Sequence, residues 1–65
     1  MDVREMKLYR FEWKIEEGRK LHIEASFCDG EEDAIAHAQK EANRHNVSVR
    51  IYDKAFFRQV KPDGH

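Results

Sequence analysis

The amino-acid sequence predicts an α+β fold in which two strands, one helix and two further strands follow one another in the order ββαββ. The first observation is the stretch Leu8–Glu16, in which the odd-numbered residues are apolar and nearly all even-numbered residues are charged. Side chains alternate across a strand, so this pattern predicts one face on a core and one face in water. The second observation is the segment from about Gly30 to His45, where small apolar residues recur at helical spacing.

The first two strands are expected to form a hairpin. Strand one should run from about Lys7 to Glu16, followed by the turn Glu17-Gly18-Arg19 and by strand two, Lys20–Phe27. Both strands carry their apolar residues at odd numbers, which in strand two are Leu21, Ile23, Ala25 and Phe27. If all of these residues face one core, the residue numbers of two directly opposed residues must add up to an even number. This register favours a three-residue loop with a bulge over a two-residue loop.

The helix has a predicted start and end. Asp29, followed three residues later by Glu32, resembles a capping box. Acidic residues fill the first turn, where the helix dipole favours them. The inner stripe should consist of Ala34, Ile35, Ala38 and Ala42, with His45 as a further candidate. Asn46 is a plausible left-handed cap at the carboxyl end.

Two strands should follow the helix. Strand three is expected at Val47–Tyr52, with Val47, Val49 and Ile51 inward, and a weaker strand four at Phe56–Lys61. If strand one lies between strands two and three, the order 2-1-3-4 makes every neighbour antiparallel, with the helix on one face of the four-stranded sheet. We expect one domain over residues 1–65, with a frayed start at 1–6 and a tail at 62–65.

Composition bounds the class of protein. The chain has 65 residues and a single cysteine, Cys28, so disulfides cannot stabilise it within one chain and a reducing, cytoplasmic setting is expected. No apolar run approaches the ~20 residues that span a bilayer, so no membrane partner is expected. The formal net charge is -1, without the basic excess of a dedicated nucleic-acid binder.

The sequence indicates no catalytic, cofactor-binding or metal-binding residues and no small-molecule substrate. The four histidines lack the close spacing of a zinc site. A nucleophile pair of Cys28 and His37 is the enzymatic alternative, but no third group is evident, and Cys28 fits a half-buried strand end. We therefore expect a non-enzymatic protein without a cofactor.

Two surfaces are candidates for binding. Phe56 and Phe57 are adjacent and must point to opposite faces of a regular strand, so one of them, with neighbouring Arg58, is a candidate contact to a partner or a second copy. The outward sheet face is expected to carry residues that suit nucleic acid, which are Arg10, Lys14, Lys20, Arg50 and Tyr52, with Arg58 as a further candidate. His22, Glu12 and Glu24 are expected on the same face. The alternative is a solvated face with cross-strand ion pairs.

Three blocks of the chain resemble a family of small uncharacterised bacterial domains, catalogued only as a domain of unknown function. Trp13-Lys14-Ile15-Glu16-Glu17-Gly18 resembles that family's Trp-x-Val-Lys-x-x-Gly hairpin, and 27–35 resembles its Phe-Asp-Thr-x-x-Glu-Ala-Ile helix entry. The closing strand pair is similar over 47–54 and Arg58, although Ala55-Phe56-Phe57 replaces the family's Asp-Gly turn and Gly30 replaces its Thr. The resemblance implies a ββαββ fold and brings no activity.

The sequence thus favours a small binding module that acts through protein–protein contacts, with a homodimer among the expected arrangements. An inhibitor or regulator of a host complex, encoded by a phage or mobile element, is one concrete form, by association with size and fold. The alternative is a nucleic-acid-binding protein that uses the basic outer face of the sheet.

Overall fold

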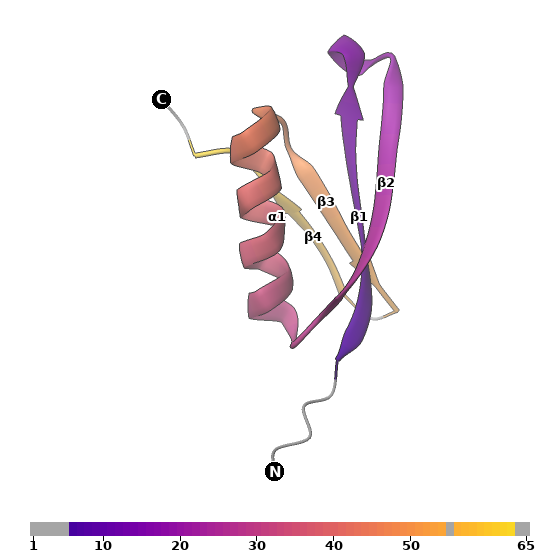
Figure 1. Ribbon diagram of the computed structural model, residues 1–65, viewed down its shortest axis with the longest axis vertical. Coiled ribbons are helices and arrows are strands. Elements are labelled where there is room, and N and C mark those ends of the chain that lie inside the picture. Colours follow the sequence, from indigo (N-terminus) through magenta and orange to yellow (C-terminus); the bar gives the residue numbers. More distant parts are fainter. Residues whose placement is uncertain (1–5, 55, 64–65) are drawn as a thin grey trace.

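The protein is a four-stranded antiparallel sheet with one helix packed on it. The computed structural model describes residues 6–54 and 56–63. Its elements in chain order are β1 (Lys7–Ile15), the 3-10 turn η1 (Glu16–Gly18), β2 (Lys20–Cys28), α1 (Glu31–His45), β3 (Val49–Asp53) and β4 (Phe56–Val60). The sheet order is β2-β1-β3-β4, and all neighbours are antiparallel (Figure 1). The predicted α+β fold, its strand order and its single helix layer are confirmed.

The core lies between α1 and the face of the sheet that we call the inner face. The odd-numbered aromatic residues of β1 are at most 3% exposed, as predicted. They meet Ala34, Ala38 and Ala42 of the helix, which are fully buried. Because alanine is small, the helix backbone can approach the sheet closely, and it lies nearest to β3. The rest of the buried cluster comes from Val49, Ile51, Val60 and Cys28.

The hairpin register differs from the prediction. β1 and β2 pair without interruption from Lys7↔Cys28 to Ile15↔Lys20, and no bulge is present. The residue numbers of two directly opposed residues therefore add up to an odd number. The loop between Ile15 and Lys20 has four residues, 16–19, and Glu16, Glu17 and Gly18 all have positive φ. A loop with an even number of residues turns the odd positions of β2 away from the odd positions of β1. The expected three-residue loop is therefore wrong.

This register decides what faces solvent. Tyr9, Phe11 and Trp13 on the inner face lie opposite Ser26, Glu24 and His22. The apolar residues of β2 must then point to the other side of the sheet, which no helix covers and which we call the outer face. The prediction that Leu21, Ile23, Ala25 and Phe27 join the core is wrong, and so is the outward placement of His22 and Glu24.

The ends of α1 agree only in part with the expected caps. The N-cap residue is Gly30, so the Asp29–Glu32 capping box does not form; instead the Asp33 carboxylate accepts a hydrogen bond of 2.9 Å from the backbone N–H of Asp29. At the other end Asn46 adopts the left-handed conformation (φ 55°, ψ 46°), as predicted. No helix in the described part of the chain has the length and apolar character needed to cross a membrane.

Part of the predicted tail is attached to the helix. The Gln39 side chain donates a hydrogen bond of 2.8 Å to the Lys61 carbonyl. The Asn43 amide both donates to the Asp63 carboxylate (2.9 Å) and accepts from the Asp63 backbone N–H (2.7 Å). The chain after β4 is therefore held against α1 as far as Asp63. The predicted frayed start overlaps residues 1–5, which lie outside the described residues, as do Gly64 and His65.

Candidate binding surface

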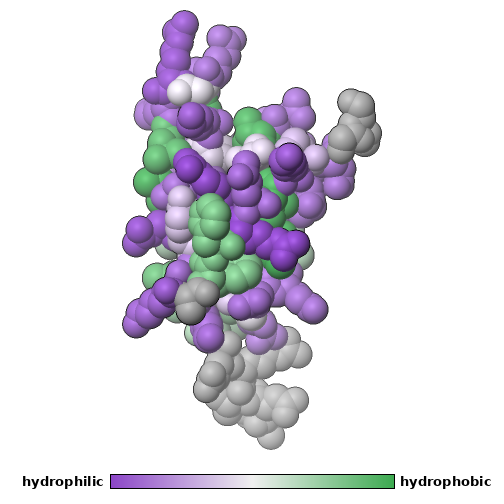
Figure 2. All heavy atoms as spheres, turned by 180° about the vertical axis from the view of Figure 1, so that it is seen from behind, coloured by the Kyte–Doolittle hydropathy of each residue, from purple (hydrophilic) through white to green (hydrophobic). Residues whose placement is uncertain are grey.

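The outer face combines an apolar edge with a charged centre. Edge strand β2 contributes the apolar column, which we define as Leu21, Ile23, Ala25 and Phe27. Leu8 of β1 lies directly opposite Phe27 and extends the column inward. Phe27 is 62% exposed, and Leu8 and Ile23 are each 53% exposed. Figure 2 shows hydrophobic atoms at the surface among hydrophilic ones on the side of the molecule away from the view of Figure 1.

The charged centre of the outer face comes from β1 and β3. Arg10 lies opposite Ala25 on one side and Tyr52 on the other, and Lys14 lies opposite Leu21. Glu12 lies opposite Arg50, and their side chains form an ion pair of 3.7 Å. With three cations and one carboxylate among these four charged side chains, the centre carries a formal charge of two positive units.

Two hollows lie along this face, on either side of the Glu12–Arg50 pair. The larger has a volume of about 370 Å³ and is lined by Leu8, Arg10, Ala25 and Tyr52 together with the turn residues Asp53 and Lys54. The other has a volume of about 310 Å³ and is lined by Trp13, Lys14, Val47, Ser48, Arg50 and Gln59. Each hollow therefore has both basic and apolar side chains in its wall.

The predicted nucleic-acid face is only partly assembled. Arg10, Lys14, Arg50 and Tyr52 do share the outer face. Lys20 does not, because it lies opposite Ile15, whose side chain packs against the core on the inner side. Arg58 lies opposite the buried residue Ile51 and is likewise on the inner side, at the exposed edge of the sheet. The outward placement of Lys20 and Arg58 is therefore wrong.

The adjacent phenylalanines point to opposite faces, as the strand geometry requires. Phe56 is half-buried on the inner side and makes an edge-to-face contact with Tyr9, with ring centroids 6.1 Å apart. Phe57 is 60% exposed on the outer face and lies opposite Tyr52, with ring centroids 5.1 Å apart. Of the three residues predicted for partner binding, Phe57 is thus the one on the outer face, whereas Phe56 contributes to the core.

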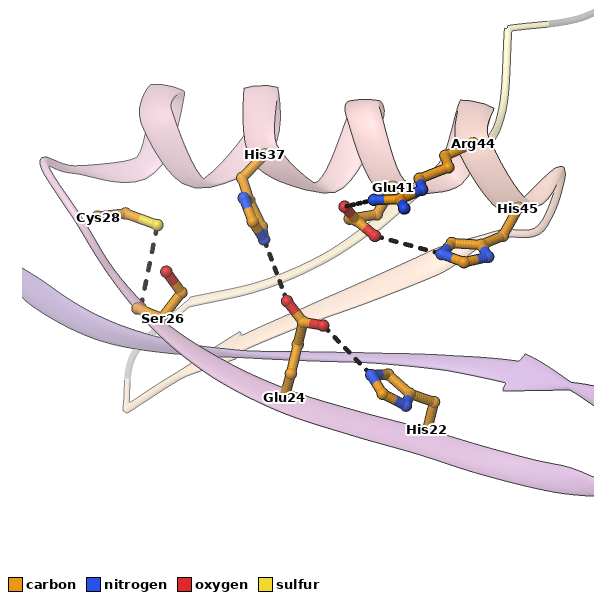
Figure 3. A network of polar contacts seen from close by, with 8 residues as sticks. All are labelled: His22, Glu24, Ser26, Cys28, His37, Glu41, Arg44 and His45. Atoms are coloured by element: carbon orange, nitrogen blue, oxygen red, sulfur yellow. Dashed lines mark hydrogen bonds and ion pairs between the residues drawn. The ribbon is translucent and has the colours of Figure 1, made fainter.

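The inner side of β2 holds a polar cluster that the sequence did not reveal. One Glu24 carboxylate oxygen lies 3.2 Å from Nε2 of His22, and the other lies 3.4 Å from Nε2 of His37 (Figure 3). The His37 ring packs on Phe11 and the His22 ring on Trp13, with centroids 4.6 and 4.5 Å apart. Figure 3 shows Glu24 of β2 reaching toward His37 of α1, while His22 of the same strand points toward Glu24, so this cluster closes the side of the core.

His45 has a similar arrangement at the end of the helix. Its Nε2 lies 3.3 Å from a Glu41 carboxylate oxygen, and its ring stacks on Trp13 at 5.3 Å. Trp13 therefore packs against two imidazole rings, those of His22 and His45. Among the described residues, no three His, Cys, Asp or Glu side chains are arranged to hold a metal ion. The positions of these histidines are explained by a structural role, in which their rings cover the aromatic residues of the core.

Two groups in the core have shifted pKa values. Burial, with a contribution from the Asp33 carboxylate, raises the pKa of the Cys28 thiol above its ordinary range. A nucleophilic cysteine needs the opposite shift, and the histidine proposed beside it, His37, is paired with Glu24. Burial also raises the pKa of the Tyr9 phenol, with the carboxylates of Asp53 and Glu31 adding to the effect. Both groups are therefore neutral at physiological pH.

Comparison of the chain with protein families, curated proteins and solved structures finds no match. The resemblance to a family of small bacterial domains stays a prediction, and the surface has to be interpreted from its own geometry. Sequence reasoning missed the apolar column as a surface because it assigned all apolar residues of the hairpin to one core. The signal that could have revealed it is the length of the loop, since a four-residue loop 16–19 reverses the parity.

Proposed function

We propose that the protein is a non-enzymatic binding module that acts through protein–protein contacts on the outer face of its sheet. The observation that carries this proposal is the hairpin register, which turns the apolar column away from the only helix in the described chain. Leu21, Ile23 and Phe27 are each between 45% and 62% exposed. In a chain of 65 residues that has few apolar side chains to spare for its core, this exposure costs stability unless a partner covers the face.

The size of the apolar surface supports a specific contact. A large aromatic side chain presents roughly 150–250 Å² and an aliphatic one somewhat less. Leu8, Leu21, Ile23 and Phe27, each about half exposed, together present on the order of 350 Å² of apolar area. The largest apolar patch on a typical monomer is ~300–600 Å² and is often functional. Together with the charged centre, the outer face approaches the ~800 Å² that each partner contributes to a standard interface.

The charges of the outer face define the chemistry of the partner. The centre of the outer face has four charged side chains. Three are cations, those of Arg10, Lys14 and Arg50, and one is the carboxylate of Glu12. Complementary potentials favour a partner with acidic side chains at this position. The apolar column requires apolar side chains next to them. We expect a segment with carboxylates along one side and large apolar residues along the other, such as a surface of a host complex bound by a small inhibitor or regulator.

Affinity capture from the native cell with matched variants tests this proposal. Leu8→Asp and Phe57→Asp each place a carboxylate on the outer face, and both should lose the partner that the wild type captures. The control is Lys40→Glu, which changes an exposed residue of α1 on the other side of the molecule and should retain capture. A partner that remains bound to both outer-face variants but not to Lys40→Glu would overturn the proposal.

Nucleic-acid binding is the second candidate, and one observation favours it. Arg10, Lys14 and Arg50 share the outer face with the aromatic pair Tyr52 and Phe57. Exposed aromatic rings can stack with bases while arginine and lysine contact phosphates. Fluorescence anisotropy with a single-stranded oligonucleotide tests this candidate. Binding should weaken steeply as salt is added and should be lost in Arg50→Glu; absent or salt-insensitive binding would eliminate it.

A further inference from the structure

The two edges of the sheet are protected to different extents. β4 is a short strand of five residues that is followed by Lys61 and Pro62, and a proline cannot extend the pairing of an edge. β2 is an edge strand of nine residues with no proline, and its register with β1 is unbroken by a bulge. Short strands, prolines, lysines, bulges and inward-pointing charged residues are devices that keep sheet edges from pairing with another chain. Between Leu21 and Cys28, β2 has one of these devices, the inward-pointing Glu24.

Glu24 protects the edge less than an isolated charge would, because its carboxylate already has partners. One oxygen lies 3.2 Å from Nε2 of His22 and the other lies 3.4 Å from Nε2 of His37. α1 leaves the edge accessible, because the helix packs more extensively on β3 and β4 than on β2. A long, regular strand therefore presents one free row of backbone donors and acceptors along the side of the sheet.

We propose that β2 pairs antiparallel with β2 of a second copy of this chain, around a two-fold axis at Ile23, and joins two sheets into one of eight strands. The proposal rests on the proposed function, since it names one partner for a protein that acts through protein–protein contacts. It concerns the sheet edge, so the outer face of each copy stays available to another protein. A two-fold pair is the closed, self-complementary arrangement that soluble homodimers commonly adopt.

Charge and the length of the paired segment together select the axis among the candidate registers. A two-fold pair that keeps both helices on the same side of the joined sheet requires opposed residues with an even sum. Centring the pair on Glu24 would place two carboxylates directly opposite each other, which is unfavourable. Centring it on Ala25 would place Glu24 opposite Ser26 and leave His22 opposite Cys28. Centring it on His22 would place Lys20 opposite Glu24, but it would pair only five residues of each β2, 20–24, whereas centring it on Ile23 pairs seven, 20–26. Centring it on Ile23 places His22 of each copy opposite Glu24 of the other, twice.

The same register is favourable on the outer face. Ile23 meets its own copy on the axis, and Leu21 lies opposite Ala25 on both sides of it. Directly opposed apolar and branched side chains stabilise a strand pair. The apolar columns of the two copies then form one continuous strip across the middle of the joined sheet. On the inner side, the two clusters of Glu24, His22 and His37 meet at the centre of the dimer.

Single cysteines test both the dimer and its axis. Directly opposed residues have Cβ atoms about 4.5–5.5 Å apart, close to the separation that a disulfide needs. Ile23→Cys should therefore form a covalent dimer when oxidised with glutathione disulfide. Leu21→Cys is the matched control, since the two positions would lie four residues apart along the strands, about 13 Å, and should not crosslink. The wild type, whose own Cys28 is buried, should not crosslink either.

Sedimentation of the wild type over a range of concentrations provides the non-covalent measurement. A dimer should form, and Ile23→Lys, which places two cations together on the axis, should weaken it by about tenfold or more. Leu8→Lys, on the outer face but one strand away from the edge, should still dimerise. Circular dichroism shows whether each variant is folded; should Ile23→Lys fail to fold, the cysteine pair decides alone.

Two results would overturn the inference. A wild type that is monomeric at every concentration excludes the dimer, and crosslinking of Ala25→Cys or Glu24→Cys in place of Ile23→Cys excludes the proposed axis. A monomer that still captures a partner through its outer face would leave the proposed function intact. A dimer that captures no partner would support the inference and count against the proposed function. Failure of the inference and failure of the proposed function are therefore distinguishable.

Discussion

The hairpin register can be tested by truncating one phenylalanine from each strand. Phe11 of β1 is fully buried, whereas Phe27 of β2 is 62% exposed. Replacing a buried phenylalanine with alanine costs about 3–5 kcal/mol, since the apolar contacts are lost and a cavity remains. Full burial of a phenylalanine is worth about 1.5–3 kcal/mol, and Phe27 gains less than half of it, so Phe27→Ala should cost about 1 kcal/mol. The substitution is identical at both positions, which cancels most of the difference in strand propensity.

Urea unfolding followed by far-ultraviolet circular dichroism measures the two losses. A domain of this size has a free energy of unfolding of roughly 3–10 kcal/mol, and its urea dependence is about 1 kcal/mol per molar. Phe11→Ala should therefore lower the unfolding midpoint by several molar or leave the chain largely unfolded. Phe27→Ala should lower it by about 1 M. Equal losses, or a larger loss at Phe27, would refute the register, because Phe27 would then be part of the core. Both proteins should be measured at one low concentration, so that self-association contributes equally.

Three further predictions concern individual residues. Trp13 is 3% exposed and its indole N–H has no partner among the described residues, so its fluorescence should be blue-shifted and resist quenching by iodide; a red-shifted, easily quenched emission would contradict its burial. The raised pKa of the Cys28 thiol favours its protonated form in the fold, so native protein should react with iodoacetamide much more slowly than unfolded protein, and stability should fall as pH rises above the pKa of the unfolded thiol. Equal rates in the two states would be inconsistent with this. Glu17 has a left-handed backbone (φ 58°), so Glu17→Gly should raise the free energy of unfolding by about 1 kcal/mol, whereas Glu31→Gly, in the first turn of α1, should not raise it.

The sequence was sufficient for the fold because strong local patterns agree with one another. Four apolar residues alternate along β1, and three alanines recur every fourth residue along α1. Each pattern identifies one buried face, and the two faces are both buried only if the helix packs on that face of the sheet. Asn46 marks the end of the helix for a local reason, its tolerance of the left-handed conformation. These inferences required no knowledge of long-range register.

The candidate surface was harder to predict, because period-two alternation shows which residues share a face but not which face is covered. In β1 the alternation is unambiguous, since the other face is charged. In β2 the apolar face and the polar face are more nearly equivalent, as His22 and Ser26 can lie beside a core if their polar atoms find partners. The number of loop residues decides between them, and a local pattern cannot supply it. Lys20 and Arg58 were misplaced for the same reason.

The two unusual features of β2 share a single cause. A shift of one residue in the hairpin would bring Leu21, Ile23 and Phe27 inside and turn Glu24 outward. The observed register does the reverse, and α1 supplies His37 to pair with the Glu24 carboxylate that comes to lie at the side of the core. Glu24 and its histidines therefore satisfy the inner side, while the apolar column on the outer side has no equivalent compensation within the described residues. A register that leaves large apolar side chains in water is stabilised when another surface covers them. The number of residues in the turn 16–19 determines which face of β2 points to solvent. The local backbone of this turn is thus linked to the protein's capacity for binding.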